Sequence, residues 1–150
     1  MKWIKDDGGR AEAGYKGTTG DCCVRAIAIV TGKPYQEVYD ALNEISKEER
    51  WKKRRGKKVK SDARTGVFKR TSRKYIESLG YKWTATMHIG SGCKVHMKAD
   101  ELPSGRLIIK ASRHMTAVID GVVHDTYDPS REGARCVYGY FKKEEEAVAE

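Results

Sequence analysis

The chain has 150 residues and a net charge of +9, with 39% hydrophobic and 34% charged residues. This balance is typical of one soluble domain with its own core, and no stretch approaches the ~20 apolar residues of a membrane span. The N-terminal residues MKWIKDDGGR also lack the apolar core of a secretory signal. We therefore expect one domain over residues 1–150, located in the cytoplasm or released into a reducing interior, with no membrane partner.

The positive charge is concentrated in one segment, residues 50–60. This segment has eight basic residues and no acidic one, so subtracting it leaves the rest of the chain at +1. We predict an exposed loop or frayed helix end here, and a loose acidic tail at about residues 143–150. Weak, nonspecific contact with nucleic-acid phosphates is expected at Lys52, Lys53, Arg54 and Arg55. A partner-docking site, an entry rim for an acidic substrate and a solvated loop are the alternatives.

The first predicted helix follows a loop rich in glycine and threonine. It runs from about Cys22 to Thr31, can be capped by Thr19 or Asp21, and stops at Gly32. Apolar residues surround nearly all of its circumference. This pattern predicts a central helix that the rest of the fold covers.

Two further helices are expected at residues 35–53 and 68–80, and after them the pattern changes to that of strands. The predicted strands cover residues 81–87, 106–111, 114–120, 122–128 and 136–143. Asp120–Gly121, between two of these strands, is a strong signal for a two-residue hairpin turn. The predicted fold class is therefore α+β, with N-terminal helices packed on a C-terminal antiparallel sheet.

Two of the four cysteines, Cys22 and Cys23, are adjacent at the start of the first predicted helix. A helix N-terminus stabilises a thiolate, because unpaired N–H groups and the positive end of the helix dipole lie there. The same N–H groups can form an oxyanion hole. The alternative is that both cysteines pack as small hydrophobic residues. In a reducing interior all four, including Cys93 and Cys136, are expected as free thiols without a disulfide framework.

A thiolate nucleophile needs a general base, which is most often histidine. Because Asp120–Gly121 is the predicted turn, His114 should lie opposite Tyr127, with Asp125 diagonal to it on the same face of the sheet. Asp128 falls on the other face unless a bulge intervenes. With one of the two adjacent cysteines, this histidine and Asp125 form a candidate catalytic triad.

This arrangement resembles papain-like cysteine peptidases, in which a cysteine begins a buried helix, a histidine begins a late strand, and an Asp or Asn lies on the next strand. The segments GDCCVRAIAIVTGKPYQEVYDAL and SRHMTAVIDGVVHDTYDPS are similar to the two halves of that pattern. The likeness is greatest to the small double-glycine peptidases and to short uncharacterised bacterial and phage proteins. It implies a papain-like fold and a hydrolase that cleaves a peptide, isopeptide or amide bond in a peptide or protein substrate.

The resemblance also assigns roles to single residues. Cys22 is the nucleophile because it directly follows an aspartate, and His114 is the general base and then the acid. Asp125 orients the histidine. Double-glycine peptidases often have the third residue in an Asp-Pro pair, which would favour Asp128, but strand parity favours Asp125.

The chain departs from many papain-like enzymes at Lys16, where those enzymes have a glutamine that donates to the oxyanion. Thr19, Lys16 or backbone N–H groups would have to take this role. The departure favours a rival interpretation, a catalytically weak or inactive papain-like fold that binds nucleic acid or an acidic protein through its basic segment. No cofactor and no metal are predicted, because His88, Cys93 and His96 lack the four-ligand spacing of a structural zinc site.

Overall fold

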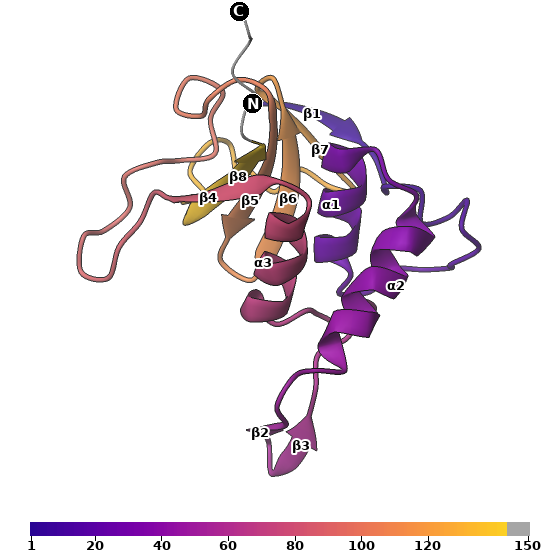
Figure 1. Cartoon of the computed structure of the whole chain (residues 1–150). Helices are drawn as coiled ribbons and strands as arrows, with labels where there is room; N and C mark the ends of the chain where they lie inside the picture. The colour runs from indigo at the N-terminus through magenta and orange to yellow at the C-terminus, as the bar shows by residue number, and fades with distance from the viewer. Residues whose placement is uncertain (144–150) are drawn as a thin grey trace, which may run out of the picture.

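The computed structural model describes residues 1–143, so the predicted acidic tail lies, except for its first residue, outside the described part. Within that part the fold is α+β, with three helices, a six-stranded mixed sheet and a separate two-stranded hairpin (Figure 1). The helices are α1 (Cys22–Thr31), α2 (Tyr35–Ser46) and α3 (Lys69–Ser78). In spatial order the sheet contains β1 (Lys2–Lys5), β7 (Val122–Asp125), β6 (His114–Ile119), β5 (Arg106–Ala111), β8 (Gly139–Lys143) and β4 (Tyr81–Ala85).

The sheet differs from the antiparallel prediction at one edge. Strands β7, β6, β5, β8 and β4 pair antiparallel, whereas β1 pairs with β7 in parallel. Strand β1 has only four residues, Lys-Trp-Ile-Lys, and all of them are exposed. Its two apolar residues are adjacent, so the sequence lacks the alternation of hydrophobic and polar residues that predicts a strand. The indole N–H of Trp3 donates to the carbonyl of Asp125 at 3.1 Å and joins the N-terminal strand to the end of β7.

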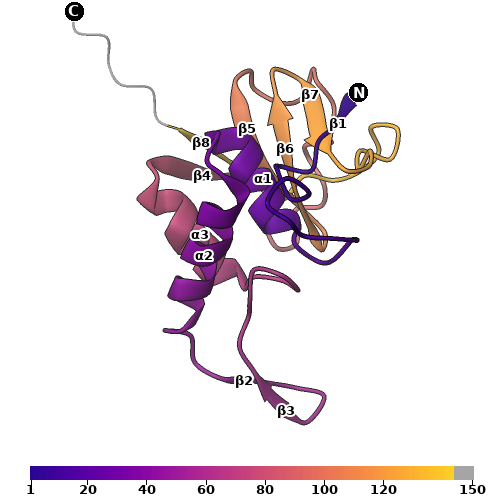
Figure 2. The ribbon, with the colours of Figure 1, turned by 90° about the vertical axis from the view of Figure 1, so that its right-hand side faces the viewer.

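The helices cover one face of the sheet, as Figures 1 and 2 show. Helix α1 packs across β6, and α2 packs against both α1 and α3. All residues of α1 from Cys23 to Val30 are buried, which confirms the prediction of a central helix. Gly32 ends α1 in the left-handed conformation, with φ 74°, and donates its N–H to the carbonyl of Ala28.

The opposite face of the sheet is covered by residues 86–105, the long connection between β4 and β5. This connection contributes Met97 and Leu102 to a second core. The strands contribute buried side chains such as Leu107 and Val118 to the same core. Strands β5 and β6 are therefore covered on both faces.

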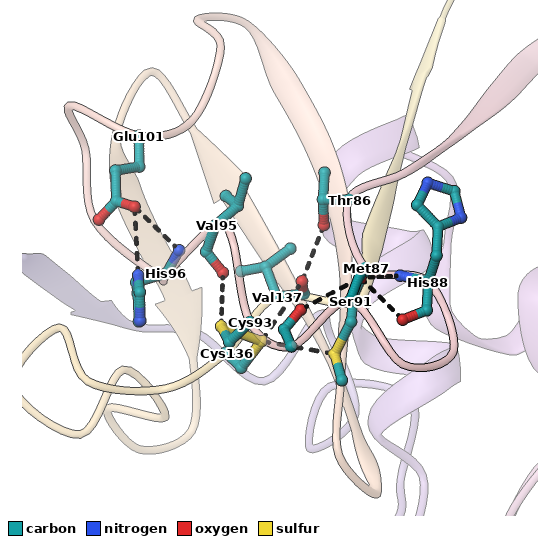
Figure 3. The surroundings of a disulfide bond; sticks show 11 residues. Thr86, Met87, His88, Ser91, Cys93, Val95, His96, Glu101, Cys136 and Val137 are labelled. Atoms are coloured by element: carbon teal, nitrogen blue, oxygen red, sulfur yellow. Dashed lines mark hydrogen bonds and ion pairs between the residues drawn. A yellow bond between two sulfur atoms is a disulfide. The ribbon is translucent and has the colours of Figure 1, made fainter.

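A disulfide between Cys93 and Cys136 joins this connection to the segment before β8 (Figure 3). Their Cα atoms are 5.9 Å apart, although 43 residues separate them in the sequence. The prediction of free thiols is therefore wrong for this pair. The two cysteines meet because the long connection folds back over the sheet, where His96 and Cys136 form an isolated β-bridge. Disulfides are rare in reducing compartments, so this bond does not favour the predicted cytoplasmic location.

The basic segment forms a hairpin rather than the predicted loop or helix end. Helix α2 stops well before residue 53, and the segment forms the antiparallel strands β2 (Lys52–Arg54) and β3 (Lys57–Val59). Arg55 and Gly56 in the turn both have positive φ, 52° and 76°, as a type I′ hairpin turn requires. A continued helix would place like charges four residues apart, where they repel. The hairpin projects from the rest of the molecule in both views (Figures 1 and 2). No helix within residues 1–143 has the length and apolar character needed to span a bilayer.

Candidate active site

Three residues from separate elements meet at one end of the sheet. Cys22 is the first residue of α1, His114 is the first of β6, and Asp125 is the last of β7. Strands β6 and β7 pair in the predicted register, with Ile119 opposite Val122, so His114 and Asp125 lie on the same face. Because α1 packs across β6, its first turn lies beside the histidine.

A short hydrogen bond joins His114 to Asp125. Nε2 of His114 lies 2.7 Å from Oδ2 of Asp125, and both side chains are buried. The same carboxylate accepts from the hydroxyl of Thr116 at 2.6 Å and from the backbone N–H of Thr126 at 2.7 Å. Burial alone would raise the pKa of Asp125, but the bonds from His114 and these donors outweigh it and lower that pKa. The carboxylate therefore stays ionised and orients the imidazole ring.

Cys22 and His114 both line one cleft, and the thiol interacts with the His114 ring and with the backbone N–H of Met115. Burial alone would raise the pKa of the thiol, but the interaction with His114, together with Met115 and Arg25, lowers it. Burial likewise would lower the pKa of His114, but its hydrogen bond to Asp125 and its interaction with Cys22 raise it. These opposite shifts favour a thiolate–imidazolium pair. With Nε2 bonded to Asp125, Nδ1 is the ring nitrogen that is left for the sulfur.

The other candidates lie elsewhere. Asp128 accepts hydrogen bonds from the backbone N–H and hydroxyl of Ser130, at 3.0 and 2.7 Å. Cys23 is buried among core residues, and this burial raises the pKa of its thiol far above the ordinary value. His124 points to the other face of β7, where Nδ1 lies 3.9 Å from Asp6. Of the alternatives considered from the sequence, the geometry brings together only the set that contains Cys22 and Asp125.

A buried ion network at the start of α1 was missed by sequence reasoning. Asp21 is fully buried, and its Oδ2 accepts from Arg10 at 3.0 Å and from the hydroxyl of Tyr35 at 2.5 Å. Its Oδ1 lies 3.5 Å from Arg25, whose guanidinium also lies 4.0 Å from Asp125. Asp21, one of the two predicted caps, does occupy the N-cap position, but its side chain makes no capping hydrogen bond. The spacing of four residues between Asp21 and Arg25 is the one local signal of this network.

Donors for an oxyanion are available from the backbone at the helix start. The N–H groups of Cys22 and Cys23 have no hydrogen-bond acceptor within the described part of the chain, and both residues line one cleft. Thr19 instead donates its hydroxyl to the carbonyl of Arg64 at 2.9 Å, and Lys16 does not line the cleft. Thr19, Lys16 and backbone N–H groups were the predicted oxyanion donors, and of these only the backbone N–H groups at the helix start are free within residues 1–143 and belong to residues that line the cleft with the thiol.

Cys22 and His114 lie in a cleft of about 440 Å³. Its walls come from the start of α1, from Arg54 of β2, from residues 65–67, from α3, and from strands β4, β5, β6 and β8. Trp83 and Phe141 form an apolar part of the wall, with ring centroids 4.8 Å apart. A cleft of this size can hold a few side chains of an extended peptide.

Gly20 brings the loop before α1 close to the segment that follows the hairpin. A Cβ atom at this position would lie 2.6 Å from the carbonyl oxygen of Thr65, a distance that real Cβ atoms do not adopt. The close approach therefore requires glycine. It sets the width of the cleft on the side of Cys22, because Gly20 and Thr65 both line it.

No protein-family model, curated protein or solved structure matched the chain. The interpretation of the site therefore depends on the sequence and geometry of this chain alone.

Proposed function

We propose that the protein is a papain-like cysteine hydrolase that cleaves a peptide, isopeptide or amide bond in a peptide or protein substrate. The observation that carries the proposal is one arrangement of three side chains: the Cys22 thiol at a helix start and the His114 imidazole line the same cleft, and Asp125 is hydrogen-bonded to Nε2 of that ring. The order of the three residues along the chain, and their places at one helix start and two strand ends, support a papain-like plan.

In the first half of the reaction, the thiolate of Cys22 attacks the carbonyl carbon of the scissile bond. The carbonyl oxygen gains negative charge, which the N–H groups of Cys22 and Cys23 stabilise. His114 gives its proton to the leaving nitrogen, and the C–N bond breaks. The amine departs, and a thioester on Cys22 and a neutral imidazole are left.

In the second half, a water molecule attacks the thioester carbon while the neutral His114 takes its proton. The C–S bond breaks, the carboxylic acid product leaves, and it loses its own proton to solvent. The thiolate–imidazolium pair is thereby restored. Asp125 stays ionised throughout and holds the ring in the one orientation that serves both halves.

A peptidyl probe with a thiol-reactive electrophile tests the proposal. We expect a single covalent adduct on Cys22 of the folded protein, detected by intact-mass spectrometry and located by peptide mapping. Cys22→Ala should abolish the adduct, and His114→Ala should slow its formation while circular dichroism stays unchanged. Labelling that persists in Cys22→Ala, or a wild-type protein that resists the probe, would contradict the proposal.

A second candidate function is binding of nucleic acid or an acidic protein through the hairpin β2–β3. On one face of the hairpin, Lys52 and Arg54 lie over the ring of Phe68 at 4.4 and 5.2 Å. The other face presents Lys53 and its cross-strand partner Lys58, both exposed. This exposed, positively charged face favours contact with phosphates or carboxylates. Such binding is compatible with hydrolysis in the cleft.

A further inference from the structure

The cleft that contains the candidate nucleophile is lined by basic side chains on two sides. On the helix side they are Lys69 and Arg73, which are four residues apart in α3 and therefore on the same face. On the sheet side they are Lys110 in β5 and Arg113 in the turn to β6. Arg54 of the hairpin adds a fifth. These residues come from three separate parts of the chain, so the fold gathers them at this place.

Most of these charges have no acidic partner. Arg73 pairs with the exposed Glu77 at 2.7 Å, but Lys69, Lys110 and Arg113 form no ion pair within residues 1–143. No acidic side chain from the described residues lines the cleft. Like charges around a partly enclosed cleft repel one another and make its potential positive. A negatively charged ligand would relieve that repulsion, so the charges of the lining favour an anionic ligand.

The aromatic part of the wall favours a peptide over a nucleic acid. Trp83 and Phe141 pack against each other with their ring planes tilted by 50°, and Phe141 is buried. They therefore offer no pair of open faces on which successive bases could stack. They can contact an apolar side chain instead. The thiol of Cys22 needs an acyl carbon to attack, and a peptide carries one.

We propose that this cleft binds an acidic peptide, whose Asp or Glu side chains lie against Lys69, Lys110 and Arg113. An apolar side chain of the peptide lies against Trp83 and Phe141. The statement that the bond at the sulfur is then cleaved rests on the proposed hydrolase function. The binding itself requires only the cleft and not a reactive thiol, so the two parts can be tested separately.

Binding is tested with the Cys22→Ala protein and two fluorescein-labelled peptides, one rich in glutamate and leucine and the other with glutamine in place of each glutamate. Fluorescence anisotropy at low salt should show at least about tenfold tighter binding of the glutamate peptide. The combined substitution Lys69→Gln, Lys110→Gln and Arg113→Gln should remove the preference. A matched control, Lys53→Gln, Lys57→Gln and Lys58→Gln, removes three charges from hairpin residues outside the cleft and should keep it.

A second measurement reads the potential at the sulfur itself. Iodoacetate and iodoacetamide alkylate the same thiolate, but only iodoacetate is negatively charged. In the protein with Cys22 intact, the ratio of the iodoacetate rate to the iodoacetamide rate should fall about tenfold when the three cleft charges are removed. The hairpin control should leave this ratio unchanged.

The outcomes of these measurements distinguish the acidic-peptide site from a hairpin site, from a nucleic-acid site and from the hydrolase proposal. Glutamate-peptide binding that survives the cleft substitutions and is abolished in the hairpin control would overturn the proposal. Tighter, cleft-dependent binding of a single-stranded oligonucleotide of the same charge would also overturn it, because the ligand would then be a nucleic acid. If Cys22 reacts with neither reagent while cleft-dependent peptide binding is present, the acidic-peptide site is supported and the hydrolase proposal fails.

Discussion

Nη2 of Arg25 lies 4.0 Å from Oδ1 of Asp125, and the other carboxylate oxygen of Asp125, Oδ2, is hydrogen-bonded to His114. Nη1 of Arg25 lies 3.5 Å from Asp21, the residue before Cys22. One guanidinium therefore bridges the carboxylate before the candidate nucleophile and the carboxylate that orients the candidate base. The bridge therefore links the helix start that carries Cys22 to the strand end that carries Asp125.

Replacing Arg25 with glutamine should lower the free energy of unfolding by about 1–2 kcal/mol, because two buried carboxylates lose a shared counter-ion while Arg10 and His114 still pair with them. Urea denaturation followed by circular dichroism measures the change. Lys47→Gln removes an ion pair with Glu44 in which both side chains are largely exposed. It should have a much smaller effect, because exposed ion pairs contribute little to stability. Equal effects of the two substitutions would show that the bridge does not stabilise the fold.

Asp125→Asn should slow alkylation of Cys22 at about pH 6 by roughly tenfold or more. The carboxylate of Asp125 helps to raise the pKa of His114, so its loss lowers that pKa. The imidazolium is then lost at lower pH, and the thiolate loses its counter-ion. Asp128→Asn is the matched control, because Asp128 is bonded to Ser130, and it should leave the rate unchanged. The reverse result would make Asp128 the orienting residue.

Reduction of the Cys93–Cys136 bond should lower the free energy of unfolding by about 4 kcal/mol, the chain-entropy value for a loop closed over 43 residues. The double substitution Cys93→Ser and Cys136→Ser should be destabilised equally and should then be insensitive to dithiothreitol. Thiol titration of the denatured, unreduced protein should find only the free cysteines, Cys22 and Cys23. Reaction of all four cysteines in that titration would contradict the bond.

Binding of nucleic acid by the hairpin is expected to be weak and indifferent to sequence. Fluorescence anisotropy with labelled DNA and RNA at several salt concentrations measures it. Lys53→Ser and Lys58→Ser together should weaken binding to every duplex about equally. They should also flatten the salt dependence by roughly 0.9 log unit for each phosphate that the protein no longer neutralises. Cys22→Ala should leave the binding unchanged. If the wild-type protein does not bind at low salt, the hairpin has another role.

The part of the site that could be predicted from the sequence depends on local signals. The Asp120–Gly121 turn fixes which residues of β6 and β7 pair, and strand parity then places His114 and Asp125 on one face. Apolar residues lie on nearly all sides of the segment between Cys22 and Gly32, and this pattern likewise predicts a central helix that begins at Cys22. These signals involve only residues that are close together in the sequence.

The remaining features depend on contacts between distant segments. Strand β1 pairs with β7 from the other end of the chain, and Arg10 reaches Asp21 across the glycine-rich loop. Cys93 meets Cys136 only after residues 86–105 fold over the sheet. The basic residues that line the cleft likewise come from separate segments. In the sequence, the most evident cluster of basic residues is the continuous run at residues 50–60. No local pattern encodes such contacts.

The pH dependence of Cys22 alkylation tests the central claim most directly. The pKa of Cys22 is lowered and that of His114 is raised, so the ion pair should exist between these two pKa values. Below the lowered pKa of Cys22 the thiolate gains a proton and the rate should fall. Above the raised pKa of His114 the imidazolium is lost, so hydrolysis should decline while alkylation continues.

We predict that iodoacetamide modifies Cys22 readily at about pH 6, where an ordinary thiol of pKa ~8.5 is almost wholly protonated. His114→Ala should move the rise in rate to the ordinary thiol range, and peptide mapping should place the early adduct on Cys22 and not on the buried Cys23. A rate that rises only in the ordinary thiol range, and that His114→Ala leaves unchanged, would show that Cys22 is an ordinary thiol and that the hydrolase proposal is wrong.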